Sequence, residues 1–188
     1  MGQLQSILKH IWENNIKDSF SKGRLNTERQ LQADLYFHLK SSCSDKYEIW
    51  VEPVIYNLDK IKPDLIITDS SKQEVVCVIE LKLTTWAESH ITSDLSKLVR
   101  FYDLSKKEGS TIDLGFFPIS SNLDANQRRN IISYPLSKSL ETAFMVISKP
   151  GSFAVKKEEV LKYAPPENFH HFVGSINDDQ VISFQKIE

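Results

Sequence analysis

The sequence predicts an α/β protein in which helices flank a central mixed β-sheet, in the order αβββαβ, with further strands or a hairpin towards the C-terminal end. Apolar residues recur at helical spacing in separate regions, and strand-like apolar runs bounded by turn residues lie between and after them. Of the 188 residues, 40% are hydrophobic and 26% are charged, as in globular proteins with a buried core. The length predicts a single domain over 1–188, with a core at roughly 27–119, an N-terminal helix in 1–22 and C-terminal strands in 140–188.

Three amphipathic helices account for the helical spacing. The first lies near the N-terminus, the second begins where Asn26 or Thr27 can cap it, and the third spans about 89–107. Their expected core-facing residues are Leu4, Ile7, Leu8, Ile11 and Trp12; Leu31, Leu35 and Leu39; and Ile91, Leu95, Leu98, Phe101 and Tyr102. A polar helix is also predicted around 125–133, ending near Pro135.

The strands are predicted from runs rich in valine, isoleucine and aromatic residues between turn residues. They cover 47–56, 64–69, 74–83, 111–119, 143–149 and 152–156, and residues 169–187 form a hairpin that turns at 177–179. Pro53 indicates an edge or a bulge in the first strand. The first three strands form a meander, which one crossover helix connects to the fourth strand.

Charge and composition narrow the classes of function. The net charge is −2 and the pI about 6.2, so a nucleic-acid contact has to come from a local basic patch or from another subunit. Two cysteines are too few for a disulfide framework. No apolar span approaches the ~20 residues of a transmembrane helix. We therefore expect a cytoplasmic protein without a membrane partner.

Charged residues interrupt the apolar strand at 74–83. Alternation of side chains along a strand places Glu80 and Lys82 on one face with Val76 and Val78. The opposite face carries Val75, Cys77, Ile79, Leu81 and Leu83. An unpaired buried charge is unfavourable by several kcal/mol, so charges placed in such a strand are usually paired, at an edge or functional.

A third charge is expected beside these two. Antiparallel pairing about the turn at 70–72 brings Asp64 next to Glu80, so that two carboxylates and the amine of Lys82 meet at one end of the sheet. Adjacent carboxylates repel unless a cation neutralises them, and Mg²⁺ is often bound by one or two carboxylates with water and phosphate oxygens. A lysine ammonium can orient a water or stabilise charge that develops on a phosphate. Cross-strand pairing on a solvated face is the alternative.

Pro63-Asp64, followed after a β-turn-β by Glu80-Leu81-Lys82, resembles the motif of the PD-(D/E)xK nuclease superfamily. The members share a restriction-endonuclease-like core of a helix, three strands, a helix and a fourth strand. The resemblance implies that Asp64 and Glu80 bind a metal ion, that the Leu81 carbonyl completes its coordination, and that Lys82 assists the attacking water.

Many members of this superfamily add an acidic residue from the first core helix. Glu28 is the candidate here, both as a catalytic residue and as a metal ligand, and stabilisation of the helix dipole is the alternative for it. The resemblance therefore implies a catalytic set of Asp64, Glu80, Lys82 and Glu28 with Mg²⁺ or Mn²⁺ as the cofactor.

The expected function is a metal-dependent endonuclease that cleaves DNA in a restriction, repair or defence system. Lys97 and Arg100 on the crossover helix, and Arg128 and Arg129 near the start of the polar helix, are the candidates for phosphate contacts, with a solvated surface as the alternative for all four. Tight DNA binding needs several basic contacts, so we expect a protein partner or a homo-oligomer.

Two other functions remain open. The first is an RNA-cleaving endonuclease similar to the cap-snatching enzymes of segmented viruses, in which His10 or His38 would have to act as a metal ligand. The second is a catalytically inactive nuclease-fold module that binds proteins. The intact set of Asp64, Glu80 and Lys82 argues against this second alternative.

Overall fold

A computed structural model describes residues 2–84, 88–115, 131–148, 157–176 and 182–187 of the chain. The helical elements are α1 (Gln3–His10), the π-helical η1 (Ile11–Ile16), α2 (Lys17–Ser21), α3 (Glu28–Ser42), the short 3₁₀ turn η2 (Ser44–Lys46), α4 (Glu88–Ser105) and α5 (Lys157–Tyr163). The strands are β1 (Tyr47–Val51), β2 (Val54–Ile55), β3 (Leu65–Asp69), β4 (Glu74–Thr84), β5 (Thr111–Gly115), β6 (Ile132–Ser148), β7 (Phe169–Ile176) and β8 (Ile182–Ile187).

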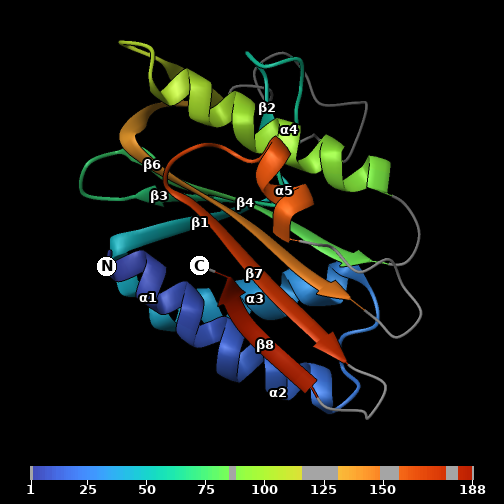
Figure 1. Cartoon of the computed structure of the whole chain (residues 1–188). Coiled ribbons are helices and arrows are strands. Elements are labelled where there is room, and N and C mark those ends of the chain that lie inside the picture. The colour runs from blue at the N-terminus through green and yellow to red at the C-terminus, as the bar shows by residue number, and fades with distance from the viewer. Residues whose placement is uncertain (1, 85–87, 116–130, 149–156, 177–181, 188) are drawn as a thin grey trace, which may run out of the picture.

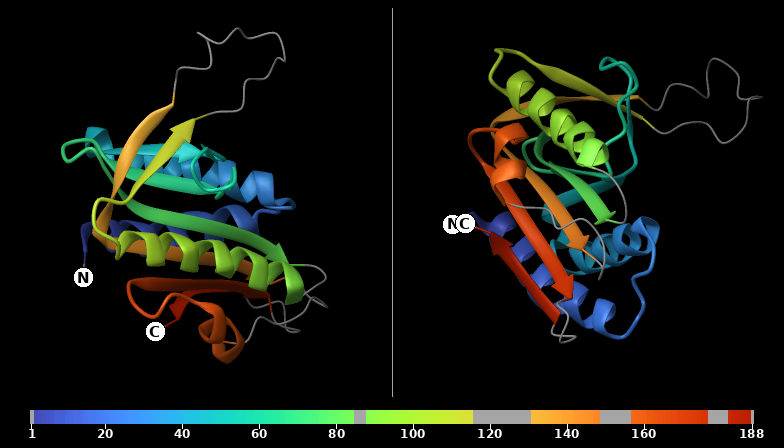
Figure 2. Two further views of the ribbon diagram at one scale, coloured as in Figure 1. Left: turned by 90° about the horizontal axis from the view of Figure 1, so that it is seen from above. Right: turned by 45° about the vertical axis from the view of Figure 1, so that its right-hand side comes forward.

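These strands form one mixed sheet with the order β1-β3-β4-β6-β5-β2, and β7 and β8 extend it from β6 (Figure 1). The β4–β6 and β6–β7 pairs are parallel and the other pairs are antiparallel. The first half of β6 pairs with β5 and its second half lies between β4 and β7. The β5–β6 ribbon therefore extends away from the rest of the sheet (Figure 2).

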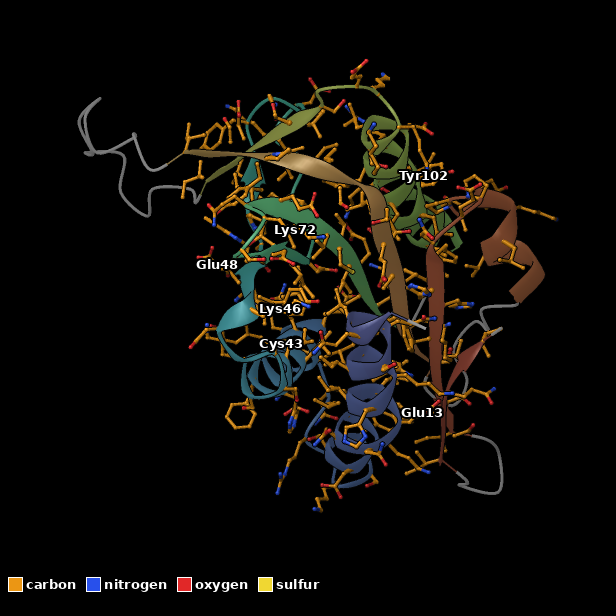
Figure 3. All side chains as sticks on the ribbon, turned by 90° about the vertical axis from the view of Figure 1, so that its left-hand side faces the viewer. Glu13, Cys43, Lys46, Glu48, Lys72 and Tyr102 are labelled. Atoms are coloured by element: carbon orange, nitrogen blue, oxygen red, sulfur yellow. The ribbon has the colours of Figure 1, made fainter. Side chains whose placement is uncertain are left out.

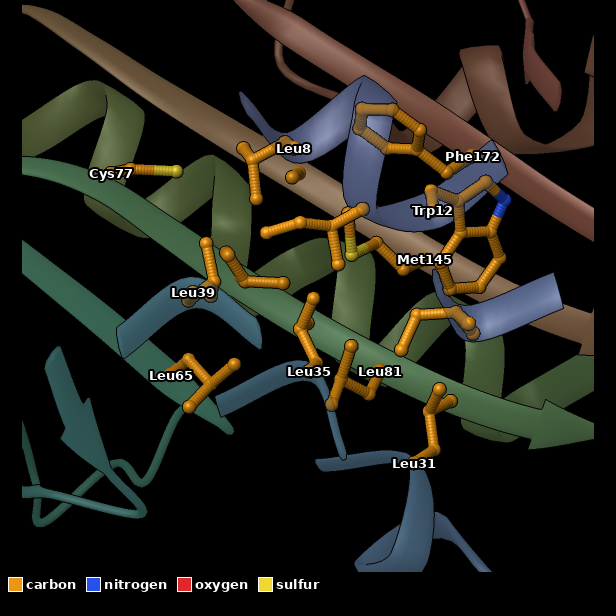
Figure 4. Close-up of a cluster of buried hydrophobic side chains, with 14 of the residues drawn as sticks. Leu8, Trp12, Leu31, Leu35, Leu39, Leu65, Cys77, Leu81, Met145 and Phe172 are labelled. Atoms are coloured by element: carbon orange, nitrogen blue, oxygen red, sulfur yellow. The ribbon is translucent and has the colours of Figure 1, made fainter. Parts of the chain in front are cut away.

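Helices cover both faces of the sheet. The N-terminal helices and α3 pack on one face, and α4 crosses the other, so that Glu13 and Tyr102 lie on opposite sides of the sheet in Figure 3. On the first face, apolar side chains of α1, η1 and α3 meet those of β3, β4, β6 and β7 (Figure 4). All the predicted core residues of the first two helices except Ile7 are buried, and Ile7 is partly buried. No helix of the described residues combines the length and apolar character needed to cross a membrane.

A β-bulge at Val76 changes the predicted alternation along β4. Ile67 pairs with Cys77 but the next residue of β3 pairs with Val75, so Val76 is an extra residue. Val75 accordingly packs on the α4 face and Val76 against the opposite core, the reverse of the prediction for both residues. An extra residue shifts the alternation on one side of the bulge relative to the other, so a strict period of two that fits the residues after Val76 fails for Val75 and Val76.

The bulge leaves the functional end of β4 as predicted. Val78 lies in the core beneath α4. Glu80 and Lys82 follow on the same face, since both form ion pairs with side chains of α4. The apolar part of β4 thus supports a charged end that lies against a helix instead of solvent.

Several predicted boundaries are wrong. The strand at 47–56 is two strands that pair with different partners, because the chain turns at Glu52, which has a φ of 45°, and at Pro53. On the side away from β3, β4 pairs with β6, and the predicted fourth strand, β5, pairs with β6 and β2. Residues 132 and 133 are strand, because β6 continues through Pro135. The helix α5 was not predicted.

Other predictions lie partly or wholly outside the described residues. These are the polar helix at 125–130, the strand at 152–156, the end of the strand at 111–119, and the hairpin turn at 177–179. The two strands of that hairpin, β7 and β8, are antiparallel as predicted.

Thr27 caps the helix that carries Glu28. Its side chain accepts a hydrogen bond from Gln30 N at 3.2 Å, and the Gln30 side chain accepts one from Thr27 N at 3.1 Å. We expect Thr27→Ala to lower the free energy of unfolding by about 1 kcal/mol, because it leaves an N–H group of the first turn without its partner. Urea denaturation measures this change. Ser41→Ala near the other end of α3 is the control, and equal losses in the two variants would contradict the capping role.

Candidate active site

The β3–β4 ladder positions the two acidic residues of the motif. Leu65 pairs with Ile79, so Asp64 and Glu80 are the next residues at the open end of the ladder. The Asp64 Oδ2 atom accepts a hydrogen bond from Leu81 N at 2.6 Å. Asp64 therefore reaches across to β4 with its carboxylate, as the antiparallel meander predicts.

The backbone of Asp64 is held from two further directions. Its carbonyl oxygen accepts hydrogen bonds from Gln32 Nε2 at 3.1 Å and from Glu52 N at 2.9 Å. Gln32 lies one turn after Glu28 on α3 and is buried. Its role was not predicted, because a glutamine on a helix gives no sign of a partner in another element. This bond joins α3 to the end of β3.

Glu80 is buried, with 1% of its surface exposed. Its Oε2 atom lies 2.7 Å from Lys97 Nζ, which donates a hydrogen bond to it. Its Oε1 atom is buried and has no hydrogen-bond partner among the described residues. A buried carboxylate oxygen without a donor is unfavourable unless another ligand completes the site.

Lys82 lies between two carboxylates. Its Nζ atom is 2.8 Å from Asp94 Oδ2 and 3.4 Å from Glu28 Oε1. Glu28 is half exposed, and its Oε1 atom also accepts a hydrogen bond from Leu83 N at 3.3 Å. All four residues of the predicted catalytic set therefore lie at one end of the sheet, and α3 contributes Glu28 there.

Asp94, like Gln32, was not predicted at this site. Its carboxylate binds both lysines, with Oδ2 at 2.8 Å from Lys82 Nζ and Oδ1 at 2.9 Å from Lys97 Nζ. An aspartate three residues before a lysine on an amphipathic helix usually belongs to the solvated face. The only signal for it was that Lys97 and Asp94 share one face of the crossover helix.

Of the remaining basic candidates, only Arg100 is described by the structure, and it is not part of this cluster. Arg100 is exposed and pairs with Asp59 at 3.0 Å. Arg128 and Arg129 lie outside the described residues. The nucleic-acid contacts of these three arginines stay predictions, whereas Lys97 points towards Glu80.

Neither histidine of the RNA-cleaving alternative is bound to the cluster. His10 contacts Asn14 on the N-terminal helix. His38 pairs with Asp34 at 3.9 Å and is ten residues from Glu28, about 15 Å along α3.

Burial and crowding shift the ionisation of the two carboxylates. Burial raises the pKa of Asp64 to about 6, although the Leu81 hydrogen bond and the charge of Lys97 oppose the rise. Burial, and then the negative charge of Asp64, raise the pKa of Glu80 well above its usual value, against the opposing charge of Lys97. Both carboxylates therefore resist ionisation unless positive charge is supplied.

The pKa values of the two lysines are also raised, which for an amine favours the charged form. Burial alone lowers the pKa of each, but for Lys82 the hydrogen bonds and charges of Asp94 and Glu28 together outweigh burial and raise its pKa. The charge and hydrogen bond of Glu80 likewise raise the pKa of Lys97. Both ammonium groups are therefore charged at neutral pH.

Asp64 makes stability depend on pH. Its pKa is higher in the folded chain than in the unfolded one, so its protonated form stabilises the fold below about pH 4, and this stabilisation is lost as the pH rises through about 6. We expect the free energy of unfolding of the wild type to fall by up to about 3 kcal/mol over this range, relative to Asp64→Asn. Denaturation of both proteins between pH 4 and 7 measures the difference. Parallel pH profiles for the two proteins would contradict the raised pKa.

The donor set fits a hard divalent cation. Among the described residues no three His, Cys, Asp or Glu side chains converge as a complete metal site. Two neighbouring carboxylates, one with a buried oxygen that has no hydrogen-bond partner among the described residues, nevertheless fit Mg²⁺, for which water and phosphate usually supply the other ligands.

The fold is that of a nuclease-like α/β protein. No protein-family model and no curated protein matches the sequence. Among solved structures, NucC of P. aeruginosa ATCC27853 in its cAAA-bound form matches with a TM-score of 0.50 and 11% identity, over 100% of this chain and 85% of that one. This likeness confirms the predicted fold class, a restriction-endonuclease-like core with a mixed sheet flanked by helices.

Two further solved structures match less closely. The cAAA-bound form of NucC from E. coli MS115-1 has a TM-score of 0.47 at 11% identity, over 100% of this chain and 84% of that one. SfsA of Pyrococcus furiosus in complex with Ca²⁺ has a TM-score of 0.36 at 12% identity, over 85% of this chain and 64% of that one.

Proposed function

We propose that the chain is a metal-dependent phosphodiesterase of the PD-(D/E)xK type, an endonuclease that cleaves DNA. The single observation that carries this proposal is the meeting of Asp64, Glu80 and Lys82 at the end of β3 and β4, on a nuclease-like fold. The raised pKa values of the two carboxylates support it, since perturbed acids concentrate at functional sites.

Each residue has a role that follows from its contacts. Asp64 and Glu80 would hold Mg²⁺ or Mn²⁺, with Glu28 and the Leu81 carbonyl as further candidate ligands. A bound cation would supply charge that polarises the scissile phosphate and lowers the pKa of the attacking water. Lys82, fixed by Asp94, would orient that water and stabilise the negative charge that develops on the phosphate.

DNA is the proposed substrate, with protein assistance. The net charge of −2 gives little long-range attraction to a polyanion, so a partner subunit or a second copy of the chain would provide further phosphate contacts. We also propose a role in a restriction, repair or defence system, because the motif of Asp64, Glu80 and Lys82 resembles that of the PD-(D/E)xK nucleases. NucC, whose fold this chain shares, binds cAAA in its solved structure, so cAAA is a reasonable activator to include in an assay.

Incubation with plasmid DNA, single-stranded DNA and RNA, with Mg²⁺, with Mn²⁺ and with EDTA, tests the proposal. Each reaction is run with and without cAAA, and Lys82→Met is the inactive control. Cleavage of DNA that needs the metal ion and Lys82 is the expected result. Cleavage of RNA but not of DNA would show that RNA is the substrate instead of DNA. Cleavage that EDTA or Lys82→Met does not change would overturn the proposal.

A further inference from the structure

Lys97 occupies the side of the Glu80 carboxylate to which a metal ion would bind. Its ammonium lies 2.7 Å from Glu80 Oε2, and Glu80 is buried with 1% of its surface exposed. In the absence of other cations Lys97 is therefore the main counter-charge of Glu80.

A second contact holds the same ammonium from the other side. Asp94 Oδ1 lies 2.9 Å from Lys97 Nζ, one turn back along α4. The Asp94 carboxylate also binds Lys82, so it remains fixed when one lysine moves. Lys97 can thus leave Glu80 without leaving the site.

We propose that Lys97 is a resident counterion of Glu80 which a divalent cation must displace, and that Asp94 retains the displaced ammonium. This inference rests on the proposed function only in that the cation binds at Glu80. Two positive charges compete for one buried carboxylate, so Lys97 weakens cation binding both by occupying Oε2 and by repulsion. Metal binding then becomes an exchange of one cation for another.

The exchange has a consequence for the site. A displaced Lys97 that stays on Asp94 adds a second ammonium beside Lys82, where the phosphate of a nucleic acid would lie. Cation binding would therefore concentrate positive charge at the site, in a chain whose net charge is −2.

Titration calorimetry with Mn²⁺ at mildly alkaline pH tests the competition, using wild type, Lys97→Met, Lys97→Arg and Glu80→Gln. Lys97→Met should bind Mn²⁺ about tenfold more tightly than wild type, because the competing charge is gone. Lys97→Arg keeps the charge and should bind no more tightly than wild type. Lys106→Met is the matched control, since Lys106 follows α4 and contacts Glu167 and the Tyr102 ring instead of the site, and should not change the affinity.

The outcomes separate this inference from the proposed function. Mn²⁺ binding that depends on Glu80 but is equal or weaker in Lys97→Met overturns the inference and leaves the proposed function standing. If neither wild type nor Lys97→Met shows Mn²⁺ binding that depends on Glu80, both the inference and the proposed function are overturned.

A measurement on the wild type covers the case in which Lys97→Met does not fold. Acylation of lysines with an amine-reactive reagent, followed by mass spectrometry, reports how available each ammonium is. Lys97 should react faster when Mg²⁺ is added, and Lys106 should react at an unchanged rate. An unchanged or slower rate at Lys97 would overturn the exchange.

Discussion

Replacing Asp64 by asparagine is expected to lower the rate of DNA cleavage by about 10³-fold or more. The variant should stay folded and be as stable as the wild type, or more stable, at neutral pH. The activity falls because a neutral amide is a poor ligand for a hard cation and removes charge from the site. The stability does not fall, because burial already opposes ionisation of Asp64 and an amide oxygen can still accept the Leu81 hydrogen bond. Cleavage rates and thermal melting of the same preparations measure the two effects.

Asp69→Asn is the matched control, at the other end of the same strand. Asp69 accepts hydrogen bonds from Ser71 and Lys72 in the β3–β4 turn, and the Ser71 side-chain bond is the main cause of its lowered pKa. This variant should lower stability at neutral pH and keep the activity of the folded protein. Asp64→Asn that loses activity only in proportion to its folded fraction would show that Asp64 is structural.

Mg²⁺ or Mn²⁺ is expected to raise the melting temperature of the wild type, and Glu80→Gln should lose most of the rise. At a concentration about 100 times the Kd, ligand binding to the folded state adds about 2.7 kcal/mol, or roughly 5–10 °C for a chain of this size. The amide in Glu80→Gln is a weaker ligand, so the gain should fall below about 2 °C. Differential scanning calorimetry with and without metal ion measures it.

Glu74→Gln provides the comparison for this result. Glu74 lies on the same strand, at its opposite end, and pairs with Lys72 at 3.4 Å. It should keep the full metal-induced rise. Equal rises in wild type, Glu80→Gln and Glu74→Gln would place the cation elsewhere in the chain.

The motif end of the site was predictable because it depends on local rules. A short turn makes β3 and β4 antiparallel neighbours, so Asp64 and Glu80 must meet, and alternation puts Lys82 on the side of Glu80. The helix α3 was predictable from its cap at Thr27 and its apolar stripe, which brings Glu28 to the same end.

The rest of the site depends on contacts that local rules do not contain. Asp94 and Lys97 reach β4 only because α4 packs across it, and the charged residues of an amphipathic helix usually face solvent. Gln32 bonds to the Asp64 carbonyl, which lies 32 residues further along the chain. The pairing of β4 with β6 is likewise a long-range choice, because β6 follows β4 in the chain only after α4 and β5.

The most direct test of the central claim, that Asp64 and Glu80 hold the catalytic cation, is anomalous diffraction from crystals soaked in Mn²⁺. The account predicts one strong peak bound by oxygens of Asp64 and Glu80 at about 2.1–2.3 Å, with Lys97 Nζ no longer at 2.7 Å from Glu80 Oε2. A peak bound by other residues, or no peak at concentrations that support cleavage, would contradict it.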